Sequence, residues 1–209
     1  MKISHMEKRC LMPIQLKRGQ HVNLNKESDK LSILQVGLGW DSIDENYGIL
    51  AKLFNKGELD CDASVIMLDE NDRLIDRSHV VYYGNLVSPD GAIIHQGDKV
   101  DGKGDGDKER ITIDLNRLSD KVKKIVFIVS LYGCENKKQH FGRLKKASIR
   151  IVDMKSMKEI INYNLSEEYY GNTALIVAEL KLAGGSWRFS AIGDGTNDCS
   201  ISRVVDRYR

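Results

Sequence analysis

The sequence predicts a mainly β protein, specifically a two-sheet antiparallel β-sandwich with a few short helices. Short segments rich in Val, Ile, Leu and Tyr recur along the chain, as expected for strands. The 209 residues include 18 glycines but only 2 prolines, and tight turns between antiparallel strands are made chiefly by Gly, Asn and Asp. About ten strands of this kind are enough for two packed sheets.

The predicted strands differ in how clearly their residues alternate. Alternation is clearest at 110–115, where Ile111, Ile113 and Leu115 share one face that should cover a core. The whole set, in chain order, is 15–24, 32–38, 63–69, 79–83, 110–115, 124–132, 147–153, 159–165, 173–182 and 187–192.

Helical signals are weaker, and the short segments that carry them do not organise the fold. Segment 46–55 carries apolar residues at helical spacing, and 115–124 has room for one or two turns. After Gly193, the offsets of Ile201, Val204 and Val205 predict a short amphipathic helix that closes the chain. Because no internal repeat or linker is visible, we expect one domain over residues 12–209, preceded by a flexible extension at 1–11.

Composition narrows the class of protein. Hydrophobic residues make up 41% and charged residues 30% of the chain, which excludes a disordered or membrane-embedded protein. The charged N-terminus lacks the apolar core of a secretory signal, so we expect a cytoplasmic protein, with peripheral association at the inner membrane surface as an alternative. Four cysteines without a C-x-x-C pair favour reduced thiols.

The net charge of +2 conceals an uneven distribution along the chain. Residues 41–76, the acidic segment, hold ten acids against three bases, and residues 117–155, the basic segment, hold eleven bases against three acids. The sequence therefore predicts two electrical poles. Few aromatic residues interrupt the basic segment, so a solvated basic face is favoured over a nucleic-acid site, with anionic lipid or an acidic protein as the intermediate option.

The most informative stretch is 98–109, the acidic loop. Five carboxylates and three glycines fall within these twelve residues, and the mutual repulsion of the acids is easiest to explain if a hard cation such as calcium neutralises them. An EF-hand is excluded because Asn116 stands at the twelfth position of the loop that Asp105 would open. Asp60 and Asp62 form a second acidic pair on one face at the start of a strand. A solvated turn and exposed strand-end acids are the alternatives.

Several separate motifs together resemble the TerD-type tellurite and stress resistance family. The likeness covers residues 12–193, in matching order and spacing. The motifs are VGLGWD (36–41), LDCDAS (59–64), SPDG (88–91), GDKVDGKGDGDKE (97–109), KIVFIV (124–129), FG (141–142), LSEE (165–168) and WRFSAIG (187–193). Lys108 stands where the family usually has another acid, and Cys61 where it usually has Leu.

The resemblance implies a calcium-binding, non-enzymatic β-sandwich associated with resistance to tellurite, phage and chemical damage. Carried over by motif, it implies metal contacts from side chains of both acidic stretches and from one or two backbone oxygens. This implied ligand set is Asp60, Asp62, Asp98, Asp105, Asp107 and Glu109, with Asp41 and Asp101 as further members and backbone oxygens at Lys103 or Gly104.

These expectations define a calcium-binding, non-catalytic module of a stress-resistance system that presents a metal-ordered surface to protein partners. Two alternatives belong to other classes. One is a calcium-dependent hydrolase, for which no acid, base or nucleophile is evident outside the ligand set. The other is an adaptor that reaches anionic membrane through the basic segment.

Overall fold

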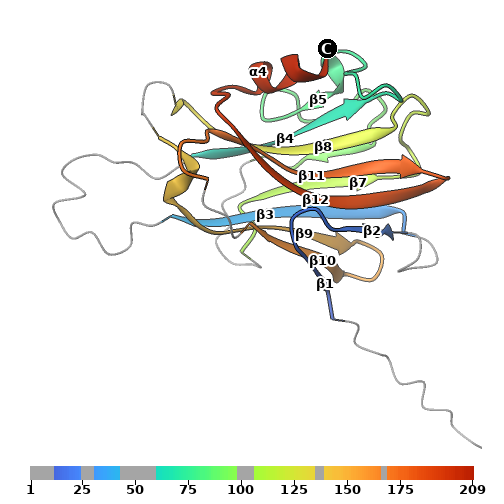
Figure 1. Cartoon of the computed structure of the whole chain (residues 1–209). Coiled ribbons are helices and arrows are strands. Elements are labelled where there is room, and N and C mark those ends of the chain that lie inside the picture. Colours follow the sequence, from blue (N-terminus) through green and yellow to red (C-terminus); the bar gives the residue numbers. More distant parts are fainter. Residues whose placement is uncertain (1–11, 25–30, 43–59, 98–105, 135–138, 166–168) are drawn as a thin grey trace, which may run out of the picture.

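The structure is a computed structural model that describes residues 12–24, 31–42, 60–97, 106–134, 139–165 and 169–209. Two six-stranded sheets pack face to face, which confirms the predicted β-sandwich (Figure 1). Neighbouring strands are antiparallel except for one parallel pair, β1 with β10. The predicted extension at 1–11 and the predicted helix at 46–55 lie outside the described residues.

Each sheet draws strands from both halves of the chain. In spatial order, sheet A contains β1 (Ile14–Leu16), β10 (Lys158–Leu165), β9 (Leu144–Asp153), β3 (Ile33–Ser42), β7 (Glu109–Asp114) and β6 (Ile93–His95). Sheet B contains β2 (His21–Asn23), β12 (Ser186–Thr196), β11 (Ala174–Ala183), β8 (Lys124–Leu131), β4 (Cys61–Leu68) and β5 (Val80–Val81). The helical turns are η2 (Arg77–His79), η3 (Phe141–Arg143), α4 (Ile201–Val205) and η4 (Asp206–Tyr208).

The main core lies between the sheets and follows the alternation of the strands. Ile111 and Ile113 of β7 are both fully buried there, as their spacing predicts. Strand β4 is buried on both faces: Val65 and Met67 join the main core, whereas Ile66 and Leu68 belong to a second apolar cluster. A strand that is covered on both sides reads as a continuous apolar run rather than an alternating one.

The C-terminal segment covers that second cluster. Val204 and Val205 of α4 are buried in it, and the carbonyl oxygen of Tyr208 accepts a hydrogen bond of 2.7 Å from the Leu74 amide. The helix predicted after Gly193 is therefore confirmed, and Figure 1 shows it beside β4 and β5. Within the described segments, no helix combines the length and the apolar character needed to cross a bilayer.

Three local predictions need correction. The strand predicted at 15–24 is two strands in different sheets, because a turn around Gly19, closed by a 2.9 Å bond from the Gln20 amide to the Lys17 carbonyl, carries the chain from β1 to β2. Strand β6 was not predicted, since three residues are too few to show alternation. Residues 115–124 form turns and contain no helix.

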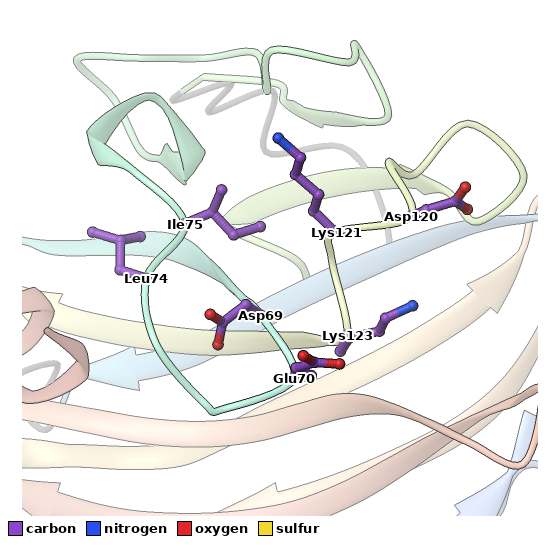
Figure 2. Close-up of a pocket in the computed structure, with 7 residues that line it drawn as sticks. All are labelled: Asp69, Glu70, Leu74, Ile75, Asp120, Lys121 and Lys123. Atoms are coloured by element: carbon purple, nitrogen blue, oxygen red, sulfur yellow. The ribbon is translucent and has the colours of Figure 1, made fainter.

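Where the structure describes them, the acidic and basic segments lie side by side rather than at separate electrical poles. Strand β4 of the acidic segment pairs along its length with β8 of the basic segment. Lys124 Nζ lies 2.8 Å from Asp72 Oδ1 and 3.4 Å from Glu179 Oε2. Figure 2 shows a pocket lined by both segments, with Asp69, Glu70, Asp120, Lys121 and Lys123 around it. Opposite charges meet there instead of forming separate faces.

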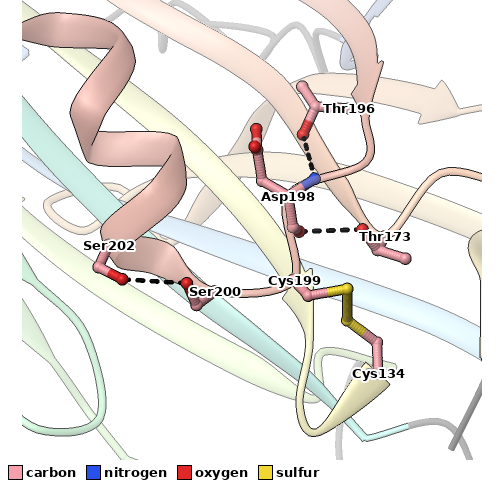
Figure 3. Close-up of a disulfide and its surroundings, with 7 residues drawn as sticks. All are labelled: Cys134, Thr173, Thr196, Asp198, Cys199, Ser200 and Ser202. Carbon is pink, nitrogen blue, oxygen red and sulfur yellow. Dashed lines mark hydrogen bonds between the residues drawn. A yellow bond between two sulfur atoms is a disulfide. The ribbon is translucent and has the colours of Figure 1, made fainter. Parts of the chain in front are cut away.

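A disulfide between Cys134 and Cys199 corrects the expectation of reduced thiols (Figure 3). The two cysteines are 65 residues apart in sequence, but their Cα atoms are 5.8 Å apart. They meet because one follows β8 and the other follows β12, and both strands flank β11. Next to the bridge, the Asp198 carbonyl accepts a 3.0 Å bond from Thr173 Oγ1. Among the described cysteines, Cys61 is free and buried.

The disulfide should stabilise the fold measurably. Closing a loop of this length contributes about 4 kcal/mol in the chain-entropy estimate. We therefore expect a reductant to lower the free energy of unfolding, measured by urea titration, by an amount of this order. A Cys134→Ser/Cys199→Ser double variant is the control, because reductant should leave its unfolding curve unchanged. Identical curves for the oxidised and reduced parent protein would contradict the prediction.

The Asp90 carboxylate should make a contribution to stability that is lost in acid. Its Oδ1 accepts hydrogen bonds from Ser88 Oγ (2.6 Å) and the Ala92 amide (3.0 Å), and its Oδ2 accepts one from the Ser119 amide (2.8 Å). Burial by itself would raise the pKa of Asp90, but these hydrogen bonds outweigh it and leave the pKa below its ordinary value. The carboxylate therefore stabilises the folded state above about pH 4, and this contribution is lost as the pH falls through the lowered pKa.

Asp90→Asn should accordingly cost about 1–2 kcal/mol of unfolding free energy at pH 7. The difference from the parent should shrink as the pH falls below about 4, where the unfolded chain begins to bind a proton at Asp90, until the folded carboxylate is itself protonated below its lowered pKa. Chemical denaturation over a pH series measures both effects, with the exposed Asp120→Asn as the matched control. A deficit that stayed constant down to pH 2 would show that Asp90 acts without titrating.

Candidate metal site

The acidic loop leaves and re-enters the sandwich between two adjacent strands. β6 and β7 pair antiparallel, with His95 opposite Ile111, and the Gln96 amide extends the ladder through a 3.0 Å bond to the Arg110 carbonyl. Residues 98–105 therefore connect two strand ends that are fixed beside each other. Of the predicted ligands, Asp98, Asp101, Lys103, Gly104 and Asp105 lie outside the described residues.

A buried polar network holds the first end of this loop. Glu109 Oε2 accepts a 3.1 Å bond from the Ala63 amide of β4 and lies 2.9 Å from His95 Nε2. His95 Nδ1 accepts a 2.9 Å bond from the Gly97 amide, so Nε2 carries the proton, and it faces both Glu109 Oε2 and the Ala63 carbonyl oxygen, the latter at 3.2 Å. The side chains of His95 and Glu109 are 1% and 5% exposed. The network thus ties the residue before the loop to both sheets.

A second ion pair holds the other end. Asp107 accepts two hydrogen bonds from Arg150 of β9, at 2.7 Å from Nε to Oδ1 and 2.8 Å from Nη2 to Oδ2. Arg110 Nε lies 3.4 Å from the same Oδ2. The Asp107 side chain is only 4% exposed. A bidentate pairing with a guanidinium is a strong way to hold a buried carboxylate, so Asp107 fixes the chain directly after residues 98–105.

Gly37 of β3 makes room for this ion pair. A Cβ atom at residue 37 would collide with the Asp107 carboxylate. Because Arg150 grips both oxygens of that carboxylate, the carboxylate cannot swing away without losing its partner. The first glycine of the VGLGWD motif is therefore required by close approach across the sheet rather than by a turn.

Asp107 and Glu109 do not share an environment, although the sequence places them two residues apart. Glu109 points between the sheets toward β4, whereas Asp107 contacts Arg110 and Arg150, which alternate with core residues and so lie on the outer face of sheet A. The intervening Lys108 lies with its Nζ 5.7 Å from the centre of the Trp40 ring. Asp107 and Glu109, which the implied ligand set groups together, therefore point to opposite sides of sheet A.

The other described acids cluster around Cys61. Asp60 is exposed and Asp62 is half-buried at the start of β4. Burial raises the pKa of the Cys61 thiol most, and the nearby charges of Asp60, Asp62 and Glu109 raise it further, against a smaller opposing effect of Lys108. The start of β4 is therefore a region of negative potential next to the loop. Asp41 pairs with Lys145 in the backbone register of β3 and β9.

The described part of the chain does not contain a complete metal site. No group of three or more His, Cys, Asp or Glu side chains within it is arranged to hold an ion. The structure brings Asp60, Asp62, Asp107 and Glu109 to the same end of the sandwich as the loop ends, with the last two engaged by His95 and Arg150. Calcium binding stays a prediction that depends on acids of 98–105.

Sequence reasoning missed two residues of this site. His95 was expected to be an ordinary surface or strand residue, but it is fully buried and bonded through both ring nitrogens. Its position directly before the acidic loop was the available signal. Arg150 was counted only as part of the basic segment, although its alternation with Ile149 and Ile151 places it on the outer face of a strand.

Comparisons with known proteins agree with this architecture. A family description, "TerD domain", matches residues 12–208. The chain belongs to the TerD family. It is 43% identical over 199 residues to "Stress response protein SCP2" of Bacillus subtilis (strain 168), which covers 94% of this chain and 100% of that protein. It is 34% identical to "Tellurium resistance protein TerD" of Serratia marcescens, which covers 88% of this chain and 91% of that protein.

A solved structure supports the fold of this TerD-family chain. The crystal structure of a homologue of telluride resistance protein (TerD) from Streptomyces coelicolor A3(2) superposes with a TM-score of 0.62, at 20% identity, over 86% of this chain and 99% of the other. At this identity, the likeness concerns the fold alone.

The packing of Asp107 against Gly37 gives a direct test of the loop anchor. Gly37→Ala should displace the carboxylate from Arg150 and cost about 2 kcal/mol of unfolding free energy, in the range typical of overpacked sites. Gln35→Ala is the matched control, since it lies two residues earlier on the same face of β3 and is half-buried. Urea denaturation measures both.

The same experiment in an Asp107→Ala background separates the anchor from general effects on the strand. There the Cβ of residue 37 meets no carboxylate, so the cost of Gly37→Ala should shrink. An equal cost in both backgrounds would show that Gly37 is needed for another reason.

Proposed function

We propose that this TerD-family chain is a calcium-binding, non-catalytic module of a cytoplasmic stress and tellurium-resistance system. The observation that supports it best is the fixing of both ends of a carboxylate-rich loop. His95, which contacts Glu109, holds the first end through the Gly97 amide, and Asp107 and Arg150 hold the other end. Fixed ends reduce the entropy that a flexible loop loses when it closes around an ion, which favours binding.

The acids divide into two roles in this proposal. Asp107 and Glu109 position the loop, because an ion would have to compete with Arg150 and His95 for their oxygens. Calcium would be held mainly by the remaining members of the implied set, and its charge would neutralise carboxylates that otherwise repel one another. These remaining members are Asp98, Asp101 and Asp105, the backbone oxygens at Lys103 or Gly104, and Asp60, Asp62 and Asp41.

Two observations support a non-catalytic role. Cys134 and His140 are close in sequence, as a nucleophile and its base could be. Cys134 forms a disulfide with Cys199, however, and is therefore unavailable as a nucleophile. Burial raises the pKa of Cys61, which keeps that thiol protonated and unreactive. The relatives carry names that describe stress response and tellurium resistance rather than a reaction. We therefore propose that the calcium-ordered loop and the adjoining start of β4 serve protein partners.

Calcium titration of the metal-stripped protein tests the proposal. Calcium should raise the melting temperature, because a ligand that binds only the folded state stabilises it by about 2.7 kcal/mol at one hundred times its Kd. Magnesium should have much less effect, since it is smaller and releases its water reluctantly. Isothermal titration calorimetry gives the calcium affinity and the number of ions bound, and differential scanning calorimetry measures the shift in melting temperature.

Two variants locate the ion. Asp105→Asn should weaken calcium binding strongly, because it removes a charge from the loop without touching either anchor. Asp120→Asn, which changes an exposed acid beyond the far end of β7, should bind calcium as the parent does. Equal melting curves in calcium and in chelator would rule out the calcium role, and normal binding by Asp105→Asn would place the ion elsewhere.

A further inference from the structure

Three tyrosines form a partly exposed cluster at the end of sheet B, next to the acidic residues of β4. The ring centroids of Tyr82 and Tyr83 are 5.2 Å apart, and those of Tyr83 and Tyr132 are 6.0 Å apart, with each pair nearly perpendicular. Tyr83 and Tyr132 are 51% and 52% exposed. Large aromatic side chains with this much exposure on a folded surface are typical of binding sites.

The backbone holds this cluster rigidly. Tyr82 and Asn85 exchange two backbone hydrogen bonds of 2.9 and 3.0 Å, and Asn85 Nδ2 also donates to the carbonyls of Ser78 and Val80 at 3.2 and 2.8 Å. The Tyr82 ring lies against Gly84, where a Cβ atom would approach it to 2.6 Å. The turn therefore presents Tyr83 in a fixed position. Such preorganisation lowers the entropic cost of binding.

Apolar side chains extend the surface beyond the tyrosines. The chain runs from the turn into Leu86 and Val87, which are 42% and 47% exposed, and Val87 forms a bridge with Ile94, which is 40% exposed. The Leu86 carbonyl accepts a 2.8 Å bond from the His95 amide, so this segment is bound to the edge of sheet A. We define the tyrosine surface as Tyr82, Tyr83, Leu86, Val87, Ile94 and Tyr132.

Negative charge lies directly beside the rings. The Asp60 carbonyl accepts a 2.8 Å bond from the Tyr132 amide, and Asp62 pairs in register with Ser130, two residues before Tyr132 in the chain. The charge of Asp62 is felt at Tyr83: burial raises the pKa of the Tyr83 phenol first, and Asp62 raises it further. Electron-rich ring faces and carboxylates both favour a cation at this position.

We propose that the tyrosine surface binds a protein partner through an arginine or lysine side chain. The cation stacks on the exposed faces of Tyr83 and Tyr132 with its charge toward Asp62. Apolar residues that flank it in the partner pack on Leu86, Val87 and Ile94. Arginine suits such a site best, because its flat, weakly hydrated guanidinium stacks on aromatic rings.

This inference goes beyond the calcium proposal and can fail separately from it. Every residue of the tyrosine surface belongs to the described fold and none lies in loop 98–105, although Asp62 beside it is also a member of the proposed calcium set. Binding measured in chelator therefore tests the tyrosine surface alone. Repeating the measurement with calcium shows whether the ion changes the affinity for the peptide. If it does, linkage requires the peptide to change the affinity for calcium by the same factor.

The probe is an amidated peptide of alternating arginine and leucine, compared with the same peptide carrying glutamate in place of arginine. Each peptide is titrated into the protein in chelator while NMR spectra of labelled tyrosine rings are recorded. Only the arginine peptide should shift the ring resonances of Tyr83 and Tyr132. Tyr83→Ala should weaken binding about tenfold, the scale of one desolvated cation–π contact. Tyr83→Phe should retain binding because the ring face is kept, and Asp62→Asn should weaken it.

Tyr170→Ala is the matched control, since Tyr170 is 80% exposed and its ring packs against His140 rather than being defined as part of the tyrosine surface. It should bind the arginine peptide as the parent does. Equal affinity for the glutamate peptide, or no effect of Tyr83→Ala, would overturn the proposal. Self-association of the parent protein that disappears in Tyr83→Ala would assign the surface to a second copy of this chain instead, and would also overturn it.

Discussion

The buried carboxylate of Glu109 joins the two sheets at the end of the sandwich that carries the acidic loop. An unpaired charge between two sheets would cost far more than a hydrogen bond returns. Glu109 therefore needs both the amide of Ala63 in sheet B and the ring of His95 in sheet A. The same ring binds the amide of Gly97, so the requirement to satisfy one carboxylate also sets where the loop begins.

The second loop anchor, the ion pair between Asp107 and Arg150, depends on a small residue, Gly37 of β3. Asp107 reaches the outer face of sheet A and meets Arg150 because Gly37 leaves the space between them open. The two anchors lie on opposite sides of one sheet and use different chemistry. Together they hold the chain on both sides of residues 98–105 without involving the acids that we propose as metal ligands.

Charge on the rest of the surface is organised by strand pairing. Because β4 and β8 are neighbours, acids at the end of one and bases at the start of the other neutralise each other locally, as Lys124 and Asp72 do. Such pairs contribute little stability each at an exposed site. Their effect is to bring opposite charges together where the two segments meet. The negative potential that remains near Asp60 and Asp62 adjoins both the loop and the tyrosine surface.

Local patterns in the sequence determined the fold class, most of the strands, the alternating face of β7 and the C-terminal helix, because these depend on residues a few positions apart. They also identified the acidic loop and, through the motifs, the family. Tertiary structure decided what depends on which strands become neighbours. The partners of Glu109 and Asp107, the burial of His95 and the Cys134–Cys199 disulfide all join residues that pairing brings together from distant positions. The turn at Gly19 assigned β1 and β2 to different sheets for the same reason, since alternation within one segment carries no information about the sheet that it joins.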